Sequence, residues 1–191
     1  MVPFRLIVTL ALTLGSGAAL AHGGHGGAGF ASGLAHPFTG VDHVLAMMAV
    51  GLLAARQPGA GRWALPAAFV LAMIAGAVLG AAGIAMPLQE AGIAASLLVF
   101  GAMVAFVARA PLAAALPIVG LFAACHGGAH FAEMGQGSLL AYVAGFTAAS
   151  VALHACGLVL GRWAPQQRVA QRAKRMLGGV IAGAGLVLLG A

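Results

Sequence analysis

The residues of this chain that could do chemistry are histidines and carboxylates gathered in short segments. The first segment reads His-Pro-Phe-Thr-Gly-Val-Asp-His and contains His36, Asp42 and His43. On one continuous helix, the two imidazoles would lie about 20° apart and share a face. Imidazoles bind transition metals, and Asp42 would either add an oxygen ligand or orient an imidazole. The structural alternative is an N-cap histidine followed by an aspartate at the helix dipole.

The second segment is Cys-His-Gly-Gly-Ala-His-Phe-Ala-Glu at 125–133. It spaces His126, His130 and Glu133 at i, i+4 and i+7, so they share one face if the helix continues to Glu133. Two imidazoles one turn apart can chelate one transition ion, and the carboxylate can add an oxygen ligand. The alternative is a pair of interfacial histidines that hydrogen-bond to lipid headgroups.

Two further groups of histidines are candidates for moving a metal. His154 follows Thr147 and Ser150 along one helix face, which predicts a polar stripe through an apolar helix. The alternative for His154 is a single hydrogen bond between helices. His22 and His25 lie in a glycine-rich stretch whose flexibility suits outer metal capture, although a linker with incidental histidines has the same composition.

These polar residues interrupt a chain that is otherwise strongly apolar. Of its 191 residues, 62% are hydrophobic and only 6% are charged, and the mean hydropathy is +1.06. Soluble domains carry about 25% charged residues, so this composition predicts an integral membrane protein. Ionisable groups inside a membrane are costly and usually mark a site or a pathway. The basic residues form short clusters between apolar runs, which indicates topology rather than nucleic-acid binding.

The apolar runs predict an all-α, polytopic membrane bundle. Residues 1–21 have the three parts of a cleavable signal peptide: Arg5, an apolar run over 6–14, and Ala-Leu-Ala ending at Ala21. An uncleaved first helix is the alternative. Residues 22–191 are predicted to form a single transmembrane domain, because runs of about 20 apolar residues cross a bilayer as helices. The six expected spans are 37–55, 63–82, 91–108, 112–130, 138–160 and 169–189.

The charge distribution predicts the orientation of these spans. The loops at 83–90 and 131–137 contain no basic residue and carry Glu90 and Glu133. The positive-inside rule then predicts a bacterial inner-membrane protein with both mature termini outside. The basic residues expected on the cytoplasmic side are Arg56, Arg62, Arg109, Arg162, Arg168, Arg172, Lys174 and Arg175.

Small residues are expected to set the packing of the bundle. Three Gly-x-x-x-Gly pairs begin at Gly76, Gly157 and Gly179. Such pairs let helices approach closely in a membrane, so they support a compact bundle. They do not define an oligomeric state.

Three segments of the chain resemble the HupE/UreJ family: 36–51, 126–133 and 145–157. The resemblance implies a hydrogenase or urease accessory membrane protein that acts as a nickel permease. Cys125 and Phe131 stand where members usually have Phe and Gly. The two family motifs, His-x5-Asp-His and His-Gly-x-x-His-x-x-Glu, map onto the candidate metal ligands His36, Asp42, His43, His126, His130 and Glu133.

The expected function is therefore import of Ni²⁺, with Co²⁺ as a second candidate substrate, by a protein that is not an enzyme. The metal would be a transported substrate in a lipid bilayer, not a permanent cofactor, and His154 would be a deeper relay for it. No phosphate-loop motif occurs in the sequence and no ATPase subunit is evident, so ATP hydrolysis by that route is not expected. Two alternatives are an intramembrane zinc hydrolase and a b-type haem protein with paired axial histidines.

Overall fold

The computed structural model describes residues 29–84, 86–108, 110–163 and 167–191, and this part of the chain is all-α, as expected. The expected signal peptide at 1–21, with His22 and His25, lies outside the described residues. The elements are α2 (Phe30–Ala35), the 3₁₀ helix η2 (His36–Phe38), α3 (Val41–Ala54), α4 (Gly61–Ala81), α5 (Gln89–Ala105), α6 (Leu112–Ala132), α7 (Leu139–Arg162) and α8 (Arg168–Leu189).

Three of the described helices, α4, α6 and α7, are long and apolar enough to cross a membrane. They overlap the expected spans 63–82, 112–130 and 138–160. The expected span 37–55 overlaps a pair of helical segments that would form a fourth span if the bent pair is counted as one. α5 is apolar but has only 17 residues, and the first half of α8 is basic. Spans at 91–108 and 169–189 therefore stay predictions.

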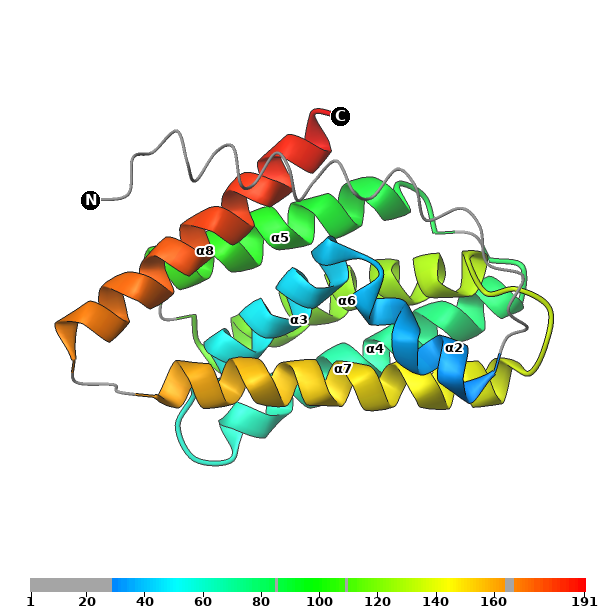
Figure 1. The fold of residues 1–191 in the computed structure, drawn as a ribbon, viewed down its shortest axis with the longest axis horizontal. Coiled ribbons are helices and arrows are strands. Elements are labelled where there is room, and N and C mark those ends of the chain that lie inside the picture. Colours follow the sequence, from blue (N-terminus) through cyan, green and yellow to red (C-terminus); the bar gives the residue numbers. More distant parts are fainter. Residues whose placement is uncertain (1–28, 85, 109, 164–166) are drawn as a thin grey trace.

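α3 is enclosed by other helices. It packs on α7, α5 and α4 near the centre of the bundle (Figure 1). Ala46, Met47 and Val50 have no exposed surface, and most of the helix after Leu45 is buried. A helix that is apolar on all sides is stable where other helices or lipid surround it. This packing fixes the position of the residues that α3 carries at its N-terminus.

α3 and α7 approach each other closely. A Cβ atom added at Gly51 would collide with the main-chain oxygen of His154, and one added at Gly157 would collide with that of Met48. Only glycine allows two backbones to come this near. The expectation that Gly157 packs against another helix is therefore confirmed.

α8 packs on α5, also through glycines, but not through the expected pair. Gly178 and Gly185 lie against the backbone of α5. Gly179 and Gly183 have no neighbouring atom within 4 Å of an added Cβ, so the prediction that they pack was wrong for the described chain. The helix turns a different face to its neighbour than the motif suggested.

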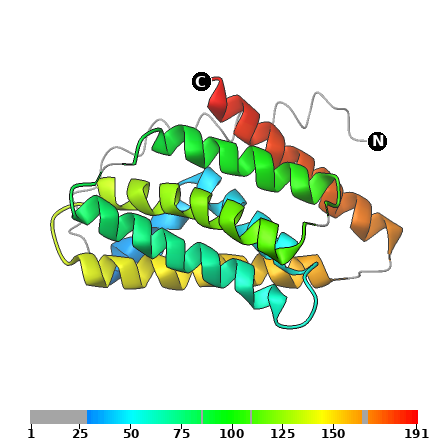
Figure 2. The ribbon, with the colours of Figure 1, turned by 180° about the vertical axis from the view of Figure 1, so that it is seen from behind.

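The helices run lengthwise through the molecule, which gives it two distinct ends. α5 and α8 lie side by side along one edge, and α7 follows the opposite edge in both views (Figure 1 and Figure 2). α4 and α6 pack against each other between these edges. One end holds the bend before α3 and the end of α6. The other holds the starts of α4 and α6, which are far from the first.

Candidate metal centre

The segment that carries His36 and His43 is bent rather than continuous. η2 ends at Phe38, and the helical segment Phe30–Phe38, which includes η2, meets α3 at 81°. The Thr39 main-chain N–H and side-chain hydroxyl both donate to the His36 carbonyl oxygen, which closes the turn. Gly40 then adopts an extended conformation. The expectation of one helix from His36 to His43 was therefore wrong, yet the bend still brings the two rings within 6.0 Å, centroid to centroid.

Gly40 fits against the side chains that follow it. A Cβ atom at this position would lie 2.6 Å from Oδ1 of Asp42 and 2.8 Å from Nδ1 of His43. Both distances are shorter than real Cβ contacts, so any other residue would displace these two side chains. Glycine is thus part of what positions the first segment.

The second segment lies at the end of α6. His126 and His130 belong to the helix, which ends at Ala132, and Glu133 is its C-cap residue. Both histidines have no exposed surface, whereas 56% of the Glu133 side chain is exposed. The carboxylate therefore stands at the surface, with the imidazoles beneath it.

Three histidines from the two segments meet in one cluster, the histidine triad of His36, His43 and His130. Each offers a ring nitrogen, and these nitrogens all lie within 4.8 Å of one another. The ring centroid of His130 is 4.7 Å from that of His36 and 4.5 Å from that of His43. Ligands about 2.1 Å from a metal ion lie up to about 4.2 Å apart, so shifts of less than about 1 Å would close the triad on one ion.

The hydrogen-bonding state of the triad fits a cation site. Within the described part of the chain, neither ring nitrogen of His130 has a hydrogen-bond partner, and nor does Nε2 of His43. Buried polar atoms are almost always paired in folded proteins, so unpaired imidazole nitrogens facing one another need an explanation. A transition metal that accepts their lone pairs provides one.

Two carboxylates contact histidines of the triad. The Nδ1–H group of His43 donates to Oδ1 of Asp42 over 2.8 Å, which leaves the Nε2 lone pair free to bind metal. Nε2 of His36 lies 3.1 Å from Oε2 of Glu133. This hydrogen bond from His36 holds the pKa of the Glu133 carboxyl below its ordinary value. Asp42 and Glu133 are therefore placed to orient imidazoles.

His126 lies beside the triad but is not among its three members. Its ring centroid is 5.0 Å from that of His43. The Ser96 hydroxyl donates its one proton to the carbonyl oxygen of Ile93, so Nε2–H of His126 must donate to Ser96, over 3.1 Å. Nδ1 of His126 is left buried and unpaired among the described residues. Ser96 was not a predicted site residue.

His154 lies deeper and is separated from the others by an aromatic ring. Its Nδ1–H group donates to the main-chain oxygen of Ser150 over 2.6 Å, and its Nε2 atom has no partner in the described chain. The Phe69 ring centroid is 4.9 Å from that of His154 and 5.5 Å from that of His126. Phe69 was not predicted, because nothing in its sequence context separates it from other core aromatics.

Tyr142 is a second aromatic residue that the sequence did not single out. Its ring centroid lies 5.7 Å from that of His36, and its buried hydroxyl has no hydrogen-bond partner among the described residues. The residue is 3% exposed. It forms one wall of the triad on the side of α7.

Comparisons with known proteins match almost the whole chain. Residues 10–188 match the family model described as HupE / UreJ protein. Protein HupE of Rhizobium leguminosarum bv. viciae is 40% identical over 188 residues, which covers 97% of each chain. No solved structure matches this chain. The chain therefore belongs to the HupE/UreJ family of hydrogenase and urease accessory proteins.

Proposed function

We propose that this protein is a permease that imports Ni²⁺, with Co²⁺ as a second substrate, for the maturation of a nickel enzyme. The observation that carries the proposal is the histidine triad, in which buried, unpaired ring nitrogens from two distant segments face one another. Imidazole suits both metals, and the two orienting carboxylates would offset part of the ion's charge. Family membership supports the same assignment.

The rings form a series that leads away from the triad. Successive centroids lie 4.7 Å apart from His36 to His130, 4.5 Å from His130 to His43, and 5.0 Å from His43 to His126. An ion that exchanges one imidazole ligand for the next would move along this series. At every position, an imidazole would replace water that the ion has lost. Beyond His126, the Phe69 ring precedes His154, the predicted relay.

The tautomers in this series are set in the same way. In His43, His126 and His154, one ring nitrogen is held by a hydrogen bond, to Asp42, Ser96 and the Ser150 carbonyl respectively. The other nitrogen is left unpaired in each. A neutral imidazole fixed through one nitrogen presents the other as a metal ligand. Each of the three histidines therefore presents one ring nitrogen as a potential metal ligand.

Exposure and charge support import as the direction of transport. The His36 side chain is 17% exposed and the His43 side chain 8%, while His130 and His126 are fully buried. The triad therefore lies at the entrance of the proposed transport path. The positive-inside rule predicts that the basic loops face the cytoplasm, so this entrance would face outward, where His22 and His25 would gather the ion.

The proposal is tested by uptake of radioactive nickel into a host that lacks its own nickel transporters. Replacing His43 or His130 with Ala should abolish uptake, with Co²⁺ competing better than Zn²⁺ against the wild type. Cys156→Ala is the matched control, because Cys156 is exposed on α7 outside the triad. Protein levels in the membrane are measured for each variant.

Two results would overturn the proposal. The first is wild-type uptake no greater than that of the empty host. The second is wild-type uptake that both histidine variants retain. Hydrolysis of an amide or lipid by the purified protein with Zn²⁺ would instead support the zinc hydrolase, which uses the same types of ligand.

A further inference from the structure

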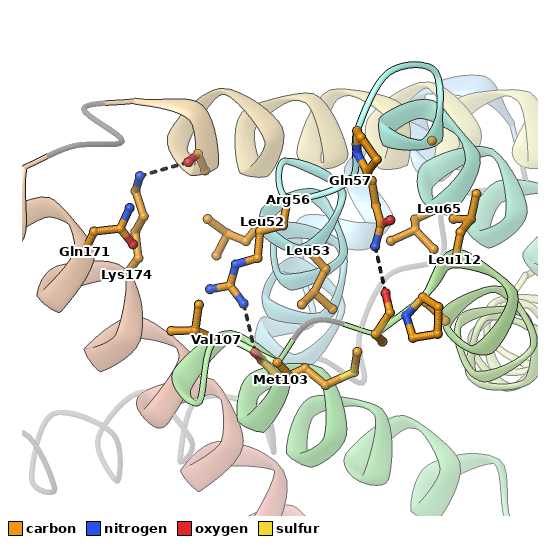
Figure 3. A pocket seen from close by; sticks show the side chains of 17 residues that line it. Leu52, Leu53, Arg56, Gln57, Leu65, Met103, Val107, Leu112, Gln171 and Lys174 are labelled. Atoms are coloured by element: carbon orange, nitrogen blue, oxygen red, sulfur yellow. Dashed lines mark hydrogen bonds between the residues drawn. The ribbon is translucent and has the colours of Figure 1, made fainter.

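We propose that the end of the bundle opposite the triad binds the phosphate group of an anionic phospholipid. A cavity of about 740 Å³ lies there, where α3, α5 and α7 end and α4 and α6 begin. Figure 3 shows Arg56 and Lys174 among the side chains that line it. From Leu112, at this cavity, to His130 in the triad, α6 rises about 27 Å. The two sites are thus separate.

The two cations come from different elements and are both tied to the backbone. The Arg56 guanidinium donates to the main-chain oxygens of Met103 and Val104, each over 2.9 Å. The Lys174 ammonium donates to those of Gly161 and Trp163, over 2.9 and 2.6 Å. These bonds fix the cations at the cavity but use neutral acceptors. A guanidinium has five N–H donors and an ammonium three, so donors remain for a ligand.

No carboxylate of the protein can neutralise these charges. The sequence has only three acidic residues, Asp42, Glu90 and Glu133. Each lies at the end of its helix that is remote from the cavity: at the starts of α3 and α5 and at the end of α6. Burial lowers the pKa of Arg56 from its ordinary value, which reflects the lost hydration of its charge. The missing counter-charge must come from outside the chain.

Helix dipoles do not provide that counter-charge. The C-terminal ends of α3, α5 and α7 lie at the cavity and together carry about one and a half negative charges. The N-terminal ends of α4, α6 and α8 meet the same cavity and together carry about one and a half positive charges. The dipoles roughly cancel, so about two positive charges remain. An anion with one or two charges matches this excess.

The walls of the cavity favour a lipid over a free anion. Leu52, Leu53, Leu65 and Val107 line it beside the cations (Figure 3). Such a surface accepts the glycerol and first acyl carbons of a lipid while the cations bind its phosphate. Basic pockets between transmembrane helices recognise anionic headgroups in this way.

The test uses the purified full-length protein, freed of lipid in detergent. Phosphatidylglycerol, phosphatidylcholine or inorganic phosphate is added separately. Native mass spectrometry counts bound lipid, and thermal unfolding reports stabilisation. We expect phosphatidylglycerol to remain bound and to raise the melting temperature by several degrees, with little effect from the other two. The double variant Arg56→Gln/Lys174→Gln should lose this preference.

The controls separate ligand binding from helix capping. Arg172→Gln removes an exposed charge of α8 that does not line the cavity and should keep the preference. If the double variant folds poorly, Lys174→Gln alone should still bind phosphatidylglycerol several-fold more weakly. Equal retention of phosphatidylglycerol and phosphatidylcholine by the wild type would overturn the proposal. So would full retention by the variants, or equal stabilisation by inorganic phosphate. None of these measurements depends on nickel transport.

Discussion

Nε2 of His36 and Oε2 of Glu133 lie 3.1 Å apart, which joins the segment before α3 to the end of α6. The pair lies at the exposed edge of the triad, whose other members are buried. The carboxylate can fix the orientation of the His36 ring and make it a stronger ligand. The contact joins two motifs that lie far apart in sequence.

Glu133→Gln should weaken metal binding without abolishing it. Glutamine keeps an oxygen that can face His36 but removes the negative charge, and such a loss typically costs about tenfold in affinity. Titration calorimetry with Ni²⁺ in detergent measures the effect. Glu90→Gln is the control, because Glu90 is an exposed carboxylate in the first turn of α5 and is not part of the triad. Equal affinities for wild type and Glu133→Gln would show that the carboxylate has no such role.

Gly40→Ala should damage the site more than the fold. The added methyl group would overlap Asp42 and His43, so the His43 ring must move away from the triad. We expect at least a tenfold loss of nickel affinity with a nearly unchanged helical circular dichroism spectrum. Gly179→Ala adds the same group in open space and should bind like the wild type. Wild-type affinity in Gly40→Ala would contradict the described packing.

His126→Ala should separate binding from transport. His126 lies beyond the triad, so the triad can still bind one ion in this variant. Transport should fall at least tenfold because the next ligand is missing. Calorimetry and uptake are measured on the same variant, with His130→Ala losing both. A loss of binding in His126→Ala equal to that in His130→Ala would place His126 in the primary site.

Phe69→Leu should increase the passage of metal. The Phe69 ring offers no lone pair and lies between the rings of His126 and His154, so it is an apolar barrier to a charged ion. We expect uptake to rise several-fold and discrimination against Zn²⁺ to fall. Phe100→Leu alters an equally buried ring that packs against Phe122 instead. Unchanged uptake in both variants would remove Phe69 from the path.

Nickel binding should weaken as pH falls. Metal binds the neutral imidazole, so protons compete with the ion for the same ring nitrogens. Because three histidines form the triad, affinity should fall more steeply than for one ligand. Calorimetry at several pH values measures this. A flat affinity from about pH 8 to 5.5 would argue against histidine ligands.

The sequence predicted the class of fold well because apolar runs have few alternatives in a membrane. Starts and ends of α4, α6 and α7 follow the expected spans closely, since basic and turn-forming residues mark them. The bend before α3 was not predicted. A Pro-Phe-Thr-Gly stretch is compatible with a helix start or with a 3₁₀ turn, and only packing against α7 distinguishes them.

The candidate site was predicted as a list of ligand types rather than as a geometry. Spacing along a helix placed His126 and His130 together, but it could not show that His130 faces His36 and His43 while His126 faces Ser96. Those relationships depend on how α3, α5 and α6 cross. The sequence offered one signal that Ser96 belongs to the site, a hydroxyl group in an apolar run. It offered no such signal for Phe69.

The triad has a consequence for how the protein is made. His36 and His43 leave the ribosome before α4 and α5, whereas His130 follows both of these helices. The triad therefore does not exist while the first half of the chain is being inserted, and a nascent chain presents only two of its three imidazoles. If the triad binds metal as proposed, capture must wait until α6 has docked. Ion binding would then selectively stabilise chains whose helices have reached their final neighbours.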